Sequence, residues 1–120
     1  MQEPSAAAAA IQAHVPMKPV WHQILLSIAT GHEHGYGIRE SVEERTNGAM
    51  RLWPATLYGT LQRMTEAGLL AETPAPDDPR GKRLFSLTDT GMAVLEAETR
   101  RLEALVSITR TESVLAGPDQ

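Results

Sequence analysis

The chain has 120 residues, contains no cysteine and carries a formal net charge of −4. This length suits one domain, and the lack of cysteine excludes disulfides, thiolate nucleophiles and the common structural zinc sites. The acidic balance argues against a generally basic coat for nucleic acid, so any contact with DNA must come from a local patch. Residues 51–83 carry five basic and four acidic side chains, whereas both flanking segments are acidic.

The first 15 residues include an alanine run at Ala6–Ala10, which favours a helix but offers little apolar surface to hold it. We expect an N-terminal tail that is mobile; the alternative is an extra helix docked onto a partner. The start is not basic, and no apolar run reaches the roughly 20 residues of a membrane span. We therefore expect a soluble, cytoplasmic protein that does not interact with membranes.

Pro16 and Pro19 mark the start of the first core helix, and Gly31 should stop it. Its apolar positions fall on one broad face. They are Val20, Trp21, Ile24, Leu25 and Ile28.

A second helix should open at Gly35, with Ile38 and Val42 one turn apart on its buried face. His32 and His34 lie in the loop before it and raise the question of a metal site. Two histidines without a defined third ligand are weak grounds for one, so we expect no metal.

A third helix is predicted between Pro54 and Gly68, because Leu57, Leu61 and Met64 fall at i, i+4 and i+7. Proline suits a first helical position, and glycine suits the position just past the last turn. The opposite face is small or polar, so its N-terminal turns could enter a major groove as a recognition helix. The alternative is a helix that does no more than cover the core.

A β-hairpin should follow this helix. Residues 69–71 begin an extended run, residues 74–79 are rich in turn formers, and residues 82–87 form the return strand with Phe85 and Leu87 on one face. A short strand at Arg51–Trp53 could lie beside this hairpin. Three helices followed by a hairpin is the order of elements in a winged helix.

The last helix should be long, with Thr88 as its N-cap and Asp89 favouring the helix dipole. Its positions for an apolar seam recur every three or four residues, as in a coiled coil. This expected dimer seam consists of Met92, Leu95, Thr99, Leu102, Val106 and Thr109. A second copy of the chain is the simplest cover for the seam, although the helix could instead fold back onto the first core helix.

Several short blocks, in this order and spacing, resemble the PadR-type winged helix transcriptional regulators. The blocks are Gly35–Ile38, Pro54–Tyr58 with Leu61 and Arg63, Ala67–Leu70, and Gly81–Thr88 leading to Gly91. The resemblance covers about residues 20–109 and implies a homodimeric DNA-binding repressor without a cofactor. It further implies that Tyr58 and its polar neighbours engage DNA, that the basic wing residues touch the backbone or minor groove, and that the last helix builds the dimer.

The expected DNA contacts combine Tyr36 at the start of the second helix with the polar face of the third helix and the wing. They are Tyr36, Thr56, Tyr58, Gly59, Thr60, Gln62, Arg63, Arg80, Lys82 and Arg83. Two features depart from the family: Trp53 stands where a serine or similar cap is usual, and Asp77 and Asp78 place negative charge on the wing. Some relatives respond to small aromatic or hydrophobic molecules, and such an effector could bind beside Met17, Trp21 and Met92.

The expected fold is mainly α with a small β-hairpin wing (α+β): a winged helix-turn-helix plus a long C-terminal dimerisation helix. The expected division is a tail at 1–15, a winged helix DNA-binding domain at 16–88, the dimerisation helix at 89–112 and a C-terminal tail at 113–120. We expect a sequence-specific regulator of double-stranded promoter DNA, a repressor that an effector could release. Catalysis is not expected, because no phosphate loop or nucleophilic set is recognisable. The alternative is a winged helix that binds another protein without specific DNA binding.

Overall fold

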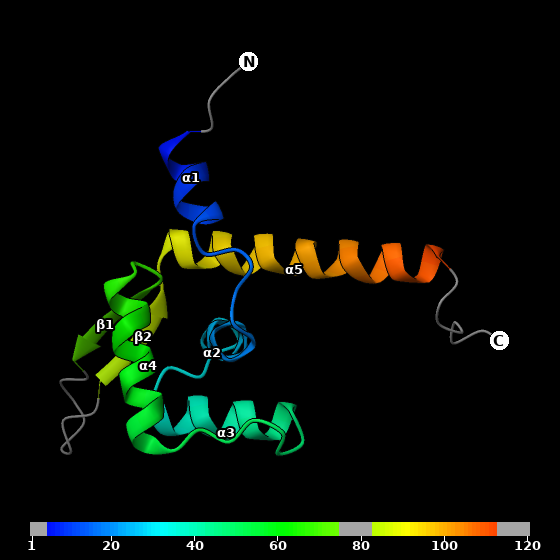
Figure 1. The fold of residues 1–120 in the computed structure, drawn as a ribbon. Coiled ribbons are helices and arrows are strands. Elements are labelled where there is room, and N and C mark those ends of the chain that lie inside the picture. Colours follow the sequence, from blue (N-terminus) through cyan, green and yellow to red (C-terminus); the bar gives the residue numbers. More distant parts are fainter. Residues whose placement is uncertain (1–4, 75–82, 113–120) are drawn as a thin grey trace.

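The computed structural model describes residues 5–74 and 83–112. This part of the chain forms five helices and one two-stranded antiparallel hairpin, so the expected mainly α architecture is confirmed. In chain order the elements are α1 (Ala6–Gln12), α2 (Pro19–Ala29), α3 (Gly35–Arg45), α4 (Pro54–Glu66), β1 (Leu70–Pro74), β2 (Arg83–Leu87) and α5 (Asp89–Thr111). Figure 1 shows α2 between α5 and α3, with α4 and the hairpin together at one end.

The core lies where α2, α3 and α4 meet the hairpin and the first half of α5. The helical faces expected from the sequence are buried there, which confirms their periodicity. The fully enclosed side chains include Ile24, Leu25, Ile38, Val42, Leu57, Leu61, Met64, Leu69 and Val94. A polar contact joins α2 to α3 beside this core, because the Arg45 guanidinium donates to the Ser27 and Ser41 hydroxyls at 3.0 and 3.1 Å.

A compact junction connects the end of α4 to the start of α5. The Thr88 hydroxyl donates to the carbonyl oxygen of Gly68 at 2.6 Å and accepts from the N–H of Gly91 at 3.0 Å, which confirms Thr88 as the N-cap. The Thr88 N–H also donates to the carbonyl oxygen of Leu69 at 3.1 Å. Gly68 turns the chain with a φ of +80°, a conformation that glycine adopts without strain.

Gly91 allows this junction to close. A Cβ atom at this position would collide with the backbone carbonyl of Leu69, which has no flexible side chain to move aside. Glycine is therefore the residue that lets α5 pass so close to the backbone that follows α4.

The N-terminal residues are not a simple tail. Residues 6–12 form α1, capped by the Ser5 hydroxyl, which accepts from the N–H of Ala8 at 3.0 Å. The helix packs against α5 of its own chain, and Ile11 and Val15 lie against the core. The expectation of a tail was wrong for this segment, because two apolar side chains one turn apart supply the contact that the alanine run lacks.

A buried ion pair anchors the middle of α5. Glu98 is only 2% exposed, and its two carboxylate oxygens accept from Arg101 Nε and Nη2 at 2.6 and 2.8 Å. The bond from Arg101 lowers the pKa of Glu98 against the opposing effect of burial, and the backbone N–H of Met17 adds to the lowering. The carboxylate thus ties the segment before α2 to α5.

The strand considered at Arg51–Trp53 is absent from the described residues, where the only sheet is the hairpin. Leu52 is buried in the core instead. The outer edge of β2 is met from another part of the chain, since the N–H of Phe85 donates to the carbonyl oxygen of Glu33 at 2.9 Å. The loop between α2 and α3 therefore occupies the place at which a third strand was considered.

Replacing Gly91 with alanine should lower the free energy of unfolding by about 3 kcal/mol, because an overpacked site next to rigid backbone cannot relax. Urea unfolding followed by circular dichroism measures this. Gly59→Ala is the matched control: its new methyl group would make only ordinary contact within α4, so it should stabilise by about 0.5–1 kcal/mol. Equal effects of the two variants would contradict the role given to Gly91.

Glu98→Gln should lower the free energy of unfolding at neutral pH by about 2 kcal/mol, because hydrogen bonds to a charged group are lost. The folded-state pKa of Glu98 lies below its ordinary 4.5, so the stability it contributes is present above that pH and disappears as the pH falls through the folded-state pKa. Acid titration of stability should therefore be shallower in the variant. Glu96→Gln, an exposed change on the same helix, should leave the wild-type profile in place.

Candidate nucleic-acid interface

The side of α4 that faces away from the core presents the row of small and polar side chains expected from the sequence. Thr56, Tyr58, Gln62 and Arg63 are exposed, and Gly59 between them leaves the backbone approachable. Pro54 occupies the first turn, and Trp53 precedes it as the N-cap residue without a capping hydrogen bond from its side chain. Figure 1 shows that α4 begins beside α3 and runs toward the hairpin.

Thr60 does not belong to this exposed row. It is 3% exposed, and its hydroxyl donates to the carbonyl oxygen of Thr56 at 2.8 Å while accepting from Arg63 Nη2 at 3.1 Å. Its expected direct contact with DNA was wrong; it orients Arg63 instead. The sequence carried a signal for this, because Thr60 lies one turn before Met64 on the apolar face.

Tyr58 is held at the contact between α4 and the start of α3. A Cβ atom added to Gly35 would lie 2.6 Å from the Tyr58 hydroxyl, so glycine at this position makes room for the ring. Tyr36, the next residue, is among the most exposed aromatic residues of the described chain. Sequence reasoning missed Gly35 as a residue that positions Tyr58, although the Gly-Tyr-Gly opening of α3 marked the place.

The base of the wing carries a paired charge. Arg83 at the start of β2 donates from Nη1 to Glu72 Oε1 on β1 at 2.8 Å, and this bond raises the pKa of Arg83. Arg80 and Lys82, the other expected basic contacts, and Asp77 and Asp78 lie outside the described residues. Sequence reasoning missed Glu72 as the partner of Arg83, a diagonal neighbour that the antiparallel register brings close.

The second half of α5 bears large apolar side chains that the described residues leave uncovered. We call this set the α5 apolar face: Leu102, Leu105, Val106 and Ile108, which are 40–59% exposed. In Figure 1 this half of the helix extends past α2. Leu95, an expected seam residue, is buried in its own core, so the exposed seam is interrupted between Met92 and the later seam residues Leu102 and Val106.

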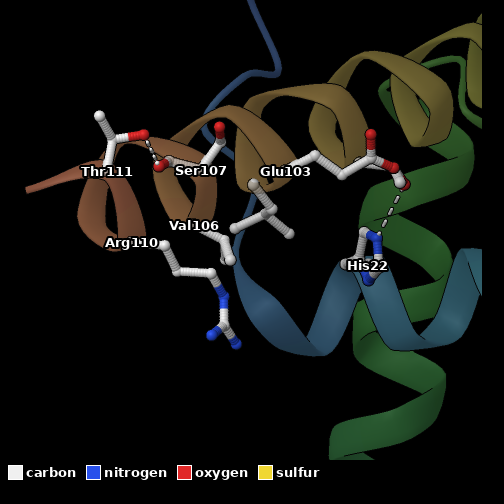
Figure 2. Close-up of a pocket in the computed structure, with 8 residues that line it drawn as sticks. His22, Glu103, Val106, Ser107, Arg110 and Thr111 are labelled. Atoms are coloured by element: carbon white, nitrogen blue, oxygen red, sulfur yellow. Dashed lines mark hydrogen bonds between the residues drawn. The ribbon is translucent and has the colours of Figure 1, made fainter. Parts of the chain in front are cut away.

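An open groove of about 710 Å³ runs along α5 beside the start of α2 (Figure 2). Its lining consists of His22, Thr99, Leu102, Glu103, Val106, Ser107, Arg110 and Thr111. His22 Nε2 lies 3.4 Å from the Thr99 hydroxyl and closes one end. Leu102 and Val106 supply an apolar floor, with Glu103 and Arg110 as charged groups beside it.

The effector residues expected from the sequence do not line this groove. Met17 is buried in the core, Trp21 packs partly buried against it, and Met92 is exposed on an earlier turn of α5. The structure does not bring these three residues together around one cavity, because Met17 and Trp21 are used for packing. The expected seam residues Leu102 and Val106 were the available signal for the groove.

Within residues 5–74 and 83–112, no three histidine, aspartate or glutamate side chains gather in a way that could hold a metal ion. No helix in these ranges is long and apolar enough to cross a membrane.

Comparisons with known proteins agree with this geometry. The model of the PadR-like family of transcriptional regulators matches residues 24–97. The transcriptional regulator Rv3488 of Mycobacterium tuberculosis is 34% identical over 82 residues, which cover 68% of this chain and 74% of that protein.

Solved structures show the same fold at lower identity. A PadR family transcription regulator from Clostridium difficile aligns with a TM-score of 0.66 and 19% identity, covering 78% of this chain and 97% of that one. The winged-helix DNA-binding protein F93 from STIV aligns with a TM-score of 0.62 and 21% identity, covering 75% and 94%. The solved structures show the winged-helix fold, and the family match over residues 24–97 together with the 34% identity to Rv3488 places the chain in the PadR-like family of transcriptional regulators.

Proposed function

We propose that this regulator is a homodimeric repressor that binds a roughly palindromic operator and blocks transcription by occupying the promoter. The observation that carries the proposal is the α5 apolar face, which stays uncovered on a helix that the core holds at its other half. A dimer supplies two recognition helices at a fixed separation, and the two-fold symmetry of the protein then matches that of the site.

The α5 apolar face favours a second copy of this chain as the protein partner. Four aliphatic side chains within seven residues form a contiguous surface, which water-exposed monomers seldom carry without a function. A two-fold contact lets the same side chains cover each other, so one helix provides both halves of the interface. The groove beside α2 would then be closed by the partner's helix.

In this proposal the exposed row of α4 enters the major groove. Thr56, Tyr58, Gln62 and Arg63 supply hydrogen-bond groups for base edges and phosphates, and Gly59 permits close approach. Tyr36 and the expected wing residues Arg80 and Lys82 contact the flanking backbone, whereas Arg83 reaches it only when its pairing with Glu72 is released. Two such helices would enter successive major grooves about 34 Å apart.

We place the expected hydrophobic or aromatic effector in the groove between α2 and α5, because apolar and charged side chains meet there. An effector bound at this position would change how two copies of α5 pack, and with it the separation of the recognition helices. A titration of candidate compounds that leaves operator affinity unchanged would remove the effector from the proposal.

The competing function is a winged helix that binds an acidic or other protein partner without specific DNA binding. The net charge of −4 is the feature that favours it. The two functions differ in whether a particular duplex is preferred, which the experiment below measures.

Val106→Glu should convert the protein from a dimer to a monomer in sedimentation and weaken operator binding at least tenfold, because buried like charges would face each other across the two-fold axis. Arg100→Glu, at an exposed position of the helix that points away from all four side chains of the α5 apolar face, is the matched control and should remain dimeric. Binding is read by fluorescence anisotropy with a duplex from upstream of the gene and a scrambled duplex, at low and moderate salt.

A preference for the native duplex that persists with salt would support the proposal. Equal binding to both duplexes that disappears with salt would favour the protein-binding alternative. A wild-type monomer would contradict the role given to the α5 apolar face, whatever the outcome with DNA.

Glu72→Gln should strengthen DNA binding and steepen its salt dependence by about 0.9 in the logarithmic slope, because Arg83 becomes free to neutralise one phosphate. Anisotropy across a salt series measures both quantities. Glu112→Gln removes the same charge at the far end of α5 and should change neither the affinity nor the slope appreciably. An unchanged slope in the Glu72 variant would mean that Arg83 does not reach the DNA backbone.

A further inference from the structure

We propose that Trp53 is a specificity residue, which contacts the C5-methyl group of a thymine in each half of the operator. This inference rests on the proposed function, since it assigns one base preference to the surface that would bind DNA. Trp53 is the position at which the chain departs from the serine or similar cap expected for the family.

The structure gives Trp53 a fixed backbone and a free side chain. Its carbonyl oxygen accepts from the N–H of Leu57 at 2.8 Å, and Pro54 follows it in the first turn of α4. The indole makes no capping hydrogen bond and is 64% exposed, so it serves neither the helix end nor the core. By contrast Trp21, the other tryptophan, packs against the core.

The position of Trp53 also separates it from the expected dimer contact. Figure 1 shows that α4 starts beside α3, at the end of the helix farther from α5. Tyr58 sits over Gly35 at this same end, with the exposed Tyr36 next to it. A second copy held through the α5 apolar face would leave this aromatic group uncovered, so its partner must be something that approaches the start of α4.

The chemistry of the indole ring indicates which group of the DNA it contacts. An indole offers a broad apolar ring and a single N–H donor, so it has little to offer a phosphate beyond one hydrogen bond. Among base edges in the major groove, only thymine presents an apolar group, its C5-methyl. The N-terminal residues of a recognition helix are those that meet base edges. Covering one methyl group with an apolar surface corresponds to about a fourfold change in affinity.

The test starts from duplexes that the full-length protein selects from a random pool. Each thymine of the selected half-site is then replaced by deoxyuridine, which removes the methyl group and keeps every hydrogen-bonding group. The wild type should lose about fourfold in affinity at one position of the half-site. Trp53→Ser should bind the thymine duplex less tightly and lose nothing further on that replacement, whereas Trp53→Phe should keep part of the dependence.

Trp21→Phe is the matched control, because it removes the tryptophan that faces the core and should preserve the thymine dependence. In this variant Trp53 is the only tryptophan, so its emission should shift to shorter wavelength when the selected duplex binds. The unfolding midpoint of Trp53→Ser should be no lower than that of the wild type, since the exposed indole packs against little and serine is a preferred N-cap residue.

Thymine dependence of equal size in the wild type and Trp53→Ser would overturn the inference while leaving the proposed function intact. Unchanged Trp53 emission on binding would overturn it as well. Failure to select any duplex would overturn the proposed function, and this inference with it.

Discussion

The junction between α4 and α5 is the constraint on which the rest of the structure depends. Thr88 holds the backbone of Gly68 and Leu69 with its own side chain and N–H, and it caps α5 with the same hydroxyl. Gly91 permits the close approach that these bonds need. The orientation of α4 relative to α5 is therefore set by backbone atoms, which cannot move independently as long side chains can. In the proposed dimer this junction transmits any change in helix packing directly to the DNA-facing surface.

Other polar contacts around the core involve α2 or the segment just before it. Arg45 links α2 to α3 through two serine hydroxyls, and His22 lies beside Thr99 of α5. Glu98 of α5 also interacts with the backbone N–H of Met17, which lies in the segment just before α2. A domain of this size has room for one core, so the groove, α4 and α1 all share a single packing arrangement.

Features set by near neighbours in the chain could be predicted from the sequence. Proline at the start of α4, glycine after its end and threonine before α5 act on adjacent backbone. The apolar periodicity of α2, α3 and α4 indicated the buried face of each of these helices. The family resemblance rested on those same local blocks. The predicted DNA-facing side of α4 was too broad at Thr60, because the position of Thr60 one turn before Met64 already placed it in the core.

Features that join distant segments could not be predicted in this way. The pairing of Phe85 with Glu33, the bond from Met17 to Glu98 and the docking of α1 depend on how helices cross, which no local pattern specifies. The groove beside α2 has the same origin, because it exists only where two helices diverge. His22 of α2 completes a lining that otherwise belongs to α5, so the seam residues Leu102 and Val106 indicated an uncovered face but not the groove beside it.

The ion pair between Glu72 and Arg83 bears on how a DNA-binding regulator finds its site. A genome offers about a million to a billion competing positions, and attraction to all of them follows the free positive charge of the protein. In the proposed function, a wing arginine paired within the hairpin, in a chain of net charge −4, would reduce the time spent on non-specific sequence. Discrimination between DNA sequences would then depend more on the fit of α4 to particular bases. The protein would bind non-specific DNA less tightly and would select its operator more strongly.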